Sequence, residues 1–225
     1  MIDLSERLRM VASLVPQCDT AADVGTDHGY LAAWLLQRGI VDHVFATDIN
    51  AGPLQRAKQT AMEQALTGRM EFYLCDGLRF PGAEAAQAVI LAGMGGETMI
   101  SILEAAPWTW QNTALILQPQ SKQPMLYRWL SEHKIGILKA RLCVDAGKRY
   151  LAFCAQGGAE VRTTEELLFR AHDPLLPDHL ASELSRIDRA IIGMERSSRD
   201  LQAERDALTA QRTYLESYRR LTQSW

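Results

Sequence analysis

The sequence predicts an α/β protein whose mostly parallel sheet ends in an antiparallel hairpin and is followed by a C-terminal α-helical coiled-coil hairpin. Three observations support this fold class. Strand-like runs alternate with helical segments from residue 20 to residue 118, two further strand-like runs follow with only a short turn between them, and leucines recur at heptad spacing near the C-terminus. Strands that alternate with helices form parallel βαβ crossovers, so we expect helices on both faces of the sheet.

The first part of the chain supplies the alternating pattern. Leu4–Val15 is expected to form an amphipathic helix, because its apolar residues recur at helical spacing between Ser5 and Pro16. From there we expect strands at 20–25, 43–48, 70–75, 86–92 and 114–118, with helices at 30–38, 53–66 and 97–105 between them.

The last two strand-like runs, at 137–144 and 149–155, are separated by the turn Asp145-Ala146-Gly147-Lys148. This connection is too short for a helix, so the runs are expected to form an antiparallel hairpin. A parallel sheet that ends in this way suits a class I methyltransferase better than a plain dinucleotide-binding domain. Two adjacent glycines at 157–158 then break the last strand, which places a domain boundary between a domain at 1–156 and a second at 160–225.

The C-terminal segment has the apolar seam of a coiled coil. Its first half has apolar residues at alternating spacings of four and three, and its second half repeats leucine every seven residues. We expect two antiparallel helices joined near Ser198, although one long helix would keep the same register. The seam residues are Leu180, Leu184, Ile187, Ile191 and Met194, followed by Leu201, Leu208 and Leu215.

Composition limits the classes of function. The formal net charge is −3 and the isoelectric point is near 6.0, so any binding of a polyanion must use a local basic surface. The N-terminal residues mix charges with isolated apolar side chains, and no apolar run approaches the ~18–20 residues of a membrane span. We therefore expect a cytoplasmic protein with no membrane partner, and we favour a monomer. The cysteines lack zinc-site spacing, so reduced thiols and no metal are expected at Cys18, Cys75, Cys143 and Cys154.

The strongest motif is the turn Asp23-Val24-Gly25-Thr26-Asp27-His28-Gly29, between the first strand and the first following helix. Glycines let the backbone curl beneath a ligand, and amides at a helix N-terminus face an anionic or polar group. We expect a cofactor to bind this turn through Gly25, Thr26, Asp27, His28 and Gly29. The sequence leaves two roles for His28, which are contact with the cofactor and a hydrogen bond within the loop.

Acidic residues follow the next two strands. Asp48 lies about twenty residues after the turn, where a carboxylate can accept hydrogen bonds from both hydroxyls of a ribose, with Ile49 beside it. Asp76 precedes Gly77 after the third strand, where a carboxylate can accept a hydrogen bond from an adenine amine. Each acid alone could cap a helix or lie in a solvated loop. Together they favour S-adenosyl-L-methionine over a nicotinamide dinucleotide as the cofactor.

Several motifs resemble the bacterial tRNA adenine-N1 methyltransferases of the TrmK type, which modify adenine 22 of tRNA. The resemblance covers about residues 2–156 closely and the helical tail loosely. It implies a Rossmann-like class I methyltransferase domain at 1–156 that binds S-adenosylmethionine, tRNA as the partner, and a coiled coil at 160–225 that helps to hold the tRNA. Asp27 departs from the pattern, because many relatives carry a glycine there. The motifs are LSxRL from Leu4, DVGTDHGYL from Asp23, ATDIN from Ala46, CDGL from Cys75, ILAGMGGETM from Ile90 and LQPQ from Leu117.

The segment Ala92-Gly93-Met94-Gly95-Gly96 follows the fourth strand, where methyltransferases that act on exocyclic amines carry an Asn/Asp-Pro-Pro-aromatic clamp. That clamp is absent. The N1 atom of neutral adenine presents an in-plane lone pair, so it needs orientation rather than a general base. We expect Ala92 and Gly93 to contact the cofactor, and Gly93, Met94 and Gly95 to position the base. The alternative is a tight turn that does not touch the substrate.

Basic residues are candidates for tRNA binding at two places. Lys122 follows the fifth strand and Arg128 lies in a segment with excess positive charge, while Arg205, Arg212 and Arg219 share one helical stripe in the tail. Ordinary solvated flanks of a coiled coil would give the same stripe. Two rival functions remain open at this point: a methyltransferase for another RNA, a protein or a metabolite, and a catalytically silent cofactor-binding interaction protein.

Overall fold

The computed structural model describes residues 2–195 and 201–225. The chain divides into two compact units, Met1–Arg162 and Thr163–Trp225. Unit 1 contains the sheet and unit 2 is helical. In the described parts of the chain, no helix is both long and apolar enough to cross a membrane.

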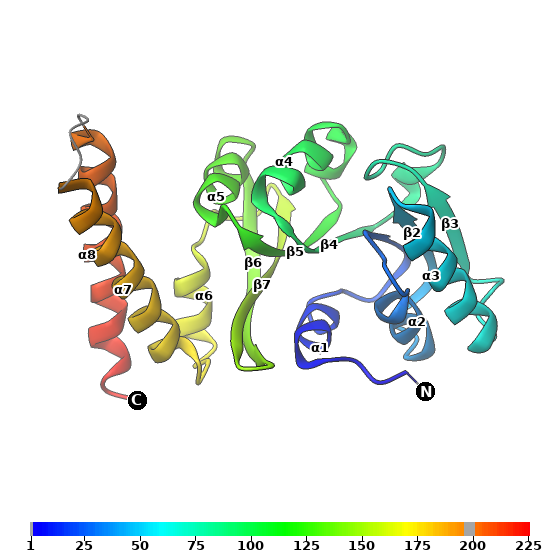
Figure 1. The fold of residues 1–225 in the computed structure, drawn as a ribbon, viewed down its shortest axis with the longest axis horizontal. Helices are drawn as coiled ribbons and strands as arrows, with labels where there is room; N and C mark the ends of the chain where they lie inside the picture. The colour runs from blue at the N-terminus through cyan, green and yellow to red at the C-terminus, as the bar shows by residue number, and fades with distance from the viewer. Residues whose placement is uncertain (1, 196–200) are drawn as a thin grey trace. The chain divides into compact units, whose positions relative to one another are not determined.

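Unit 1 is built on a seven-stranded sheet with the order β3-β2-β1-β4-β5-β7-β6 (Figure 1). Strands β1 to β5 run parallel, and β7 runs antiparallel to both β5 and β6, which confirms the predicted fold class. Strand order reverses between β1 and β4, and ligands of such sheets bind beyond the carboxyl ends of the strands at this point. The strands are β1 Cys18–Val24, β2 Val41–Asp48, β3 Met70–Leu74, β4 Ala88–Gly95, β5 Ala114–Ser121, β6 Ile135–Asp145 and β7 Lys148–Gly157.

Helices cover both faces of this sheet. Buried side chains from the first three helices of unit 1 belong to one apolar core. The fourth and fifth helices of unit 1, α4 and α5, pack together on the other side of β4 and β5 (Figure 1). The central strands are apolar over several consecutive residues because both of their faces are buried. The helices of unit 1 are α1 Glu6–Ala12, α2 Tyr30–Gln37, α3 Ala51–Glu63, α4 Gly96–Glu104 and α5 Gln123–Glu132, with 3₁₀ turns at Ala83–Ala85 and Pro107–Trp110.

Most elements begin or end within a few residues of the predicted positions, and two boundaries and one additional helix differ in ways that matter for the fold. Helix α1 ends at Ala12 rather than at residue 15. Leu14 and Val15 are also buried in the core, but they follow the helix and are not part of it. Strand β4 extends past residue 92 to Gly95, with register irregularities on both sides of Met94. Helix α5 was not anticipated. Only three of its ten residues are buried, so its apolar stripe is short.

The predicted hairpin between β6 and β7 is confirmed. Asp145 pairs with Lys148, which leaves Ala146 and Gly147 as the two turn residues. Both have positive φ, at 48° and 75°, as a type I′ hairpin turn requires. The turn places the Asp145 carboxylate near the N-terminal helix, a contact that bears on the site described below.

Unit 2 consists of α6 Thr164–Arg170, α7 Leu176–Glu195 and α8 Gln202–Thr222. Helices α7 and α8 lie side by side in opposite directions (Figure 1), so two helices form rather than one long helix. Apolar side chains of the predicted seam are buried between them, and Arg212 Nε forms an ion pair of 2.7 Å with Asp188 Oδ1 across the pair. The predicted joint near Ser198 lies outside the described residues. The buried seam residues are Leu180, Leu184, Ile187 and Leu215.

Candidate functional site

The glycine turn after β1 has a tightly determined backbone. Gly25, Asp27 and Gly29 all have positive φ, at 75°, 50° and 68°. The amides of Gly25 and Thr26 both donate to the carbonyl of Thr47 at the end of β2, at 2.8 and 3.0 Å. A Cβ on Gly29 would lie 3.0 Å from the Cβ of Ala57 on α3. Glycine is therefore required at 29 by both backbone conformation and close packing.

Asp23 is the buried acid of this turn. Its side chain is only 5% exposed, and its Oδ2 accepts a hydrogen bond of 2.7 Å from Thr26 Oγ1. Burial raises the pKa of Asp23 to about 6, against the opposing effect of the Thr26 hydrogen bond, and the charge of Asp48 raises it further. The sequence reasoning had treated Asp23 only as part of the turn. The structure shows that this carboxyl group is buried, which raises its pKa well above the usual range of an aspartate.

The two other acids follow β2 and β3 in different environments. Asp48 is 9% exposed, and its Oδ1 accepts a hydrogen bond of 2.8 Å from the amide of Asn50. Asp76 is largely exposed and lies 3.3 Å from Arg79 Nη1. The loop that carries Asp76 is fixed to β2, because Thr47 Oγ1 donates to the carbonyl of Gly77 at 2.9 Å.

Their neighbours Ile49 and Gly77 also occupy different environments. Ile49 is exposed beside Asp48, where an apolar ligand surface can reach it. Gly77 has a φ of 65°, and a Cβ there would meet Ile102 of α4 at 3.0 Å. The bend of the loop that follows β3 is thus set by close packing as well as by backbone conformation.

The end of β4 lies against the glycine turn. The Sδ-methyl carbon of Met94 lies 3.4 Å from where a Cβ on Gly25 would stand. Gly93 has a φ of 84°, and a Cβ there would lie 3.4 Å from Arg7 Nη1. A Cβ on Gly95 would lie 3.0 Å from the Ser121 hydroxyl oxygen. The structure therefore brings the segment predicted to position the base next to the turn predicted to hold the cofactor.

A pocket opens where these segments meet. Its lining includes four of the residues predicted to bind the cofactor in the turn, together with Ala92 of β4. Asp48 and Asp76 lie outside this lining. The pocket thus corresponds to one end of the predicted cofactor site. Its lining residues are Arg7, Leu8, Asp23, Gly25, Thr26, Asp27, His28, Tyr30, Leu31 and Ala92.

Asp27 and His28 project from the turn. Asp27 Oδ1 forms an ion pair of 2.7 Å with Arg56 Nη2 of α3. The His28 ring stacks on the Tyr30 ring, with centroids 5.1 Å apart and planes 16° apart, and its Nε2 lies 3.8 Å from Asp27 Oδ1. His28 therefore both lines the pocket and lies beside the loop carboxylate, so its two predicted roles stay open.

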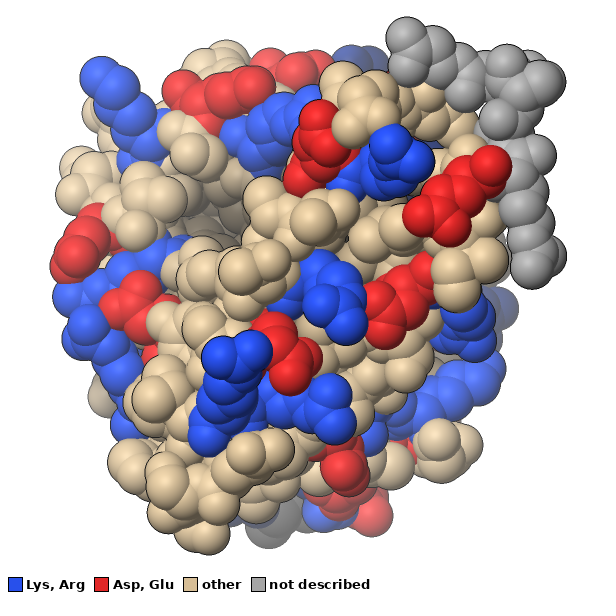
Figure 2. Space-filling view, turned by 90° about the vertical axis from the view of Figure 1, so that its left-hand side faces the viewer, with Lys and Arg blue, Asp and Glu red and all other residues tan. Residues whose placement is uncertain are grey.

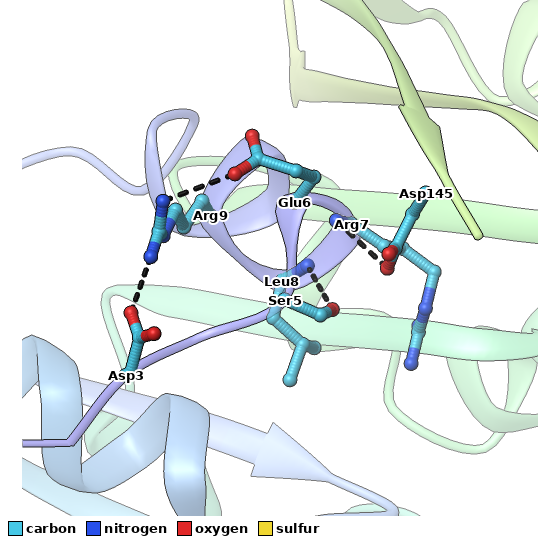
Figure 3. A network of polar contacts seen from close by, with 7 residues as sticks. All are labelled: Asp3, Ser5, Glu6, Arg7, Leu8, Arg9 and Asp145. Carbon is cyan, nitrogen blue, oxygen red and sulfur yellow. Dashed lines mark hydrogen bonds and ion pairs between the residues drawn. The ribbon is translucent and has the colours of Figure 1, made fainter. Parts of the chain in front are cut away.

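The sequence reasoning missed Arg7. Its backbone amide donates to Asp145 Oδ2 at 3.2 Å, which joins α1 to the end of β6 (Figure 3). The nearby acids of α1 and its approach, Asp3 and Glu6, both pair with Arg9 instead (Figure 3).

The Arg7 side chain points to the site. Its Nη1 donates to Gln118 Oε1 at 3.1 Å, and its guanidinium lies 5.9 Å from the Tyr150 ring centroid. Among the described residues, this half-buried cation meets an amide oxygen and an aromatic ring rather than a carboxylate. The motif Leu4-Ser5-x-Arg7-Leu8 was the signal that could have identified it.

The residues predicted to bind tRNA lie in both units. In unit 1, Lys122 Nζ lies 3.7 Å from Glu97 Oε1, and Arg128 is exposed on α5. On α8 of unit 2, each of the three predicted arginines has a nearby partner: Arg205 has Gln202, Arg212 has Asp188 and Arg219 has Glu216. Figure 2 shows Lys and Arg side chains interleaved with Asp and Glu on the face that it presents. Acidic side chains therefore lie beside two of these arginines, Arg212 and Arg219.

Comparisons with known proteins agree with this arrangement. Residues 4–153 match the family described as "Methyltransferase domain". The tRNA (adenine(22)-N(1))-methyltransferase of Bacillus subtilis (strain 168) is 30% identical over 158 residues, which span 70% of this chain and 66% of that relative.

Two solved structures share the fold along most of this chain. The crystal structure of the B. subtilis m1A22 tRNA methyltransferase TrmK is 22% identical, with a TM-score of 0.82, and the match covers 97% of this chain and 100% of that one. Streptococcus pneumoniae Sp1610, described as a candidate tRNA (m1A22) methyltransferase, was solved in complex with S-adenosyl-L-methionine. It is 26% identical, with a TM-score of 0.78, over 97% of this chain and 100% of that one.

Proposed function

This chain belongs to the methyltransferase-domain family, and from its similarity to the tRNA (adenine(22)-N(1))-methyltransferase of B. subtilis we propose that it is a TrmK-type tRNA methyltransferase, which uses S-adenosylmethionine to methylate N1 of adenine 22. The observation that carries the proposal is the meeting of the glycine turn at Gly25 with Met94 at the topological switch point of the sheet. The relatives named above are the source of the tRNA position.

The residues of the site have the chemistry to bind each part of S-adenosylmethionine. Asp48 keeps carboxylate lone pairs for the ribose hydroxyls after accepting from Asn50, and Asp76 is exposed for the adenine amine. The half-buried Arg7 guanidinium is a suitable partner for the carboxylate of the methionine moiety, since charged hydrogen-bond pairs are the strong ones. The Gly25–Gly29 turn would lie beneath the part of the cofactor that links its ribose to its methionine carboxylate. When bound, the cofactor supplies an electrophilic methyl group on a sulfonium.

The segment at the end of β4 suits a nucleophile that needs no proton removed. No titratable side chain is present at Gly93, Met94 or Gly95. The nearby Asp23 carboxyl group already accepts a hydrogen bond from the Thr26 hydroxyl. The adenine N1 lone pair forms the new C–N bond as the C–S bond breaks, and the positive charge moves from sulfur to the methylated base. This chain therefore contributes orientation of N1 and exclusion of water rather than general-base catalysis.

The two units divide the work in this proposal. Unit 1 binds the cofactor and carries out the transfer, and unit 2 helps to hold the tRNA, with Arg205, Arg212 and Arg219 of α8 as phosphate contacts. Lys122 and Arg128 of unit 1 contribute contacts nearer the reacting base. The protein acts in the cytoplasm, because its substrate is found there.

Transfer of a labelled methyl group to an unmodified tRNA transcript tests the proposal. We expect the purified protein to methylate the transcript, and mass spectrometry to map N1-methyladenine to position 22. A transcript with guanine at position 22 is the matched control and should accept no label. Label on a different nucleotide, or no transfer by a protein that binds the cofactor, would contradict the proposed substrate.

A further inference from the structure

Two aromatic rings form a flat surface at the edge of the pocket. The rings of His28 and Tyr30 are stacked, with a centroid distance of 5.1 Å and an interplanar angle of 16°. Both residues line the pocket together with Gly25 and Ala92. Tyr30 is 44% exposed and the His28 side chain is 42% exposed, so the pair faces solvent as well as the pocket.

The packing of the fold does not account for this ring pair. Tyr30 is the first residue of α2, and the side chains that α2 buries against the sheet belong to other residues. A single exposed aromatic residue is ordinary, but two parallel rings on the wall of one pocket make a preformed planar surface. The buried residues of α2 are Leu31, Ala32, Ala33, Leu35 and Leu36.

The backbone that carries the His28 ring is anchored on both sides. Asp27, immediately before His28, is fixed to α3 by its ion pair with Arg56, and Gly29, immediately after it, packs against Ala57. A surface fixed in this way loses little conformational entropy when a ligand stacks on it.

The proposed reaction can use such a surface. N1 lies on the Watson–Crick edge of adenine, so the base must leave its pair and its stack before N1 can reach a methyl donor. An extruded base loses its stacking neighbours, and proteins commonly replace them with aromatic side chains. His28 belongs to the turn assigned to the methyl donor, and Tyr30 is the first residue after that turn.

We propose that Tyr30, supported from behind by His28, is the surface on which the target adenine stacks during methyl transfer. This inference rests on the proposed function. It assigns Tyr30 to substrate binding rather than to the cofactor, and it makes the aromatic ring, not the hydroxyl group, the part that acts.

Two substitutions separate the ring from the hydroxyl group. Tyr30→Phe keeps the ring, so it should methylate tRNA at close to the wild-type single-turnover rate. Tyr30→Leu keeps an apolar side chain without a ring, and it should be slower by about 10-fold or more at saturating tRNA, the size of one lost base–aromatic stack. Both variants should bind S-adenosylhomocysteine with wild-type affinity, measured by calorimetry.

A binding cycle tests the contact without relying on turnover. Affinity for tRNA is measured for the wild-type protein and for Tyr30→Leu, each with intact tRNA and with tRNA that is abasic at the target position. If Tyr30 stacks on the target base, removing the base weakens binding to the wild-type protein by roughly 10-fold and changes binding to Tyr30→Leu little.

Two results would overturn the inference. Additive losses in the cycle would show that Tyr30 does not touch the target base, and a loss of S-adenosylhomocysteine affinity in Tyr30→Leu with an additive cycle would place the residue in the cofactor pocket. In both cases the wild-type protein still methylates tRNA. A wild-type protein that binds S-adenosylhomocysteine but transfers no methyl group to tRNA would instead refute the proposed function, and the stacking role with it.

Discussion

The glycine turn of unit 1 and the helical hairpin of unit 2 use their sequences in opposite ways. In the turn, individual close approaches decide the structure: a Cβ on Gly29 would lie only 3.0 Å from the Cβ of Ala57, and two amides share the Thr47 carbonyl. In the hairpin, a continuous apolar seam holds the helices together, and the exposed charges pair locally, as Arg212 does with Asp188. The turn should therefore be sensitive to single substitutions, and the hairpin should tolerate them.

The largest effect is expected from Gly29→Ala. The change places a Cβ in a left-handed conformation, at about 1–2 kcal/mol, and within 3.0 Å of Ala57, which adds overpacking of about 1–3 kcal/mol. Chemical denaturation should show the sum of both penalties. Gly39→Ala is the matched control, because its φ is 63° but nothing lies within 4 Å of the added Cβ. Equal destabilisation by both variants would show that the contact with Ala57 contributes nothing.

The second effect is a pH dependence of stability that arises from Asp23. Its pKa is raised from 3.8 to about 6 in the folded protein, so the folded state binds the proton more tightly than the unfolded state. This contribution to stability is complete below pH 4 and is lost as the pH rises through about 6, which amounts to up to about 3 kcal/mol.

Asp23→Asn removes this titration and keeps an acceptor for Thr26. In urea denaturation series from pH 4 to pH 8, the variant should gain stability relative to the wild-type protein as the pH rises, and the difference should level off above pH 7. A difference that stays constant with pH would mean that the Asp23 carboxyl is already ionised throughout, contrary to the effect of its burial.

A third, comparable effect concerns the cofactor. Asp48→Ala should weaken S-adenosylmethionine binding by about 1–3 kcal/mol, because it removes a charged hydrogen-bond partner, and Asp76→Ala should fall at the lower end of this range because Asp76 is exposed. Asp42→Ala is the control, since Asp42 lies near the opposite end of β2 and pairs with Arg69. Wild-type affinity in calorimetry for both strand-end variants would remove these acids from the cofactor site.

The smallest effect is expected in the hairpin. Arg212→Gln should change the unfolding midpoint little, because exposed ion pairs contribute little to stability. If Arg212 contacts a phosphate, the variant should also reduce the slope of log affinity for tRNA against log salt concentration by about one. Asp188→Asn breaks the same ion pair and keeps the arginine, so its slope should not fall. The same reduction in both variants would mean that Arg212 acts through the helix pair and not on the tRNA.

The difference between the two regions also explains what the sequence could predict. The alternation of strands and helices, the hairpin turn at Ala146-Gly147 and the paired tail helices follow from local patterns, and all three were predicted correctly. The bulge in β4 at Met94 was not, because it depends on the register with β5, a strand more than twenty residues later.

Arg7 shows the same limit at the site. Its place in the pocket depends on the contact between α1 and Asp145, which are separated by 138 positions in the sequence. Helical periodicity identified α1 only as an element that packs on the core. The residues of the glycine turn could be named in advance because they form one continuous motif, from Asp23 to Gly29.

The contact between Arg7 and Asp145 also affects the order of events during synthesis. Helix α1 is synthesised before the sheet, but the carboxylate that accepts a hydrogen bond from its Arg7 amide belongs to the last hairpin of the sheet. Contacts between such distant segments form late, because the chain between them must first be closed into a loop. The wall of the pocket formed by α1 is therefore completed only when the whole sheet is available. A nascent chain gains this wall once β6 and β7 have been made, while the helices that follow Arg162 are still to come.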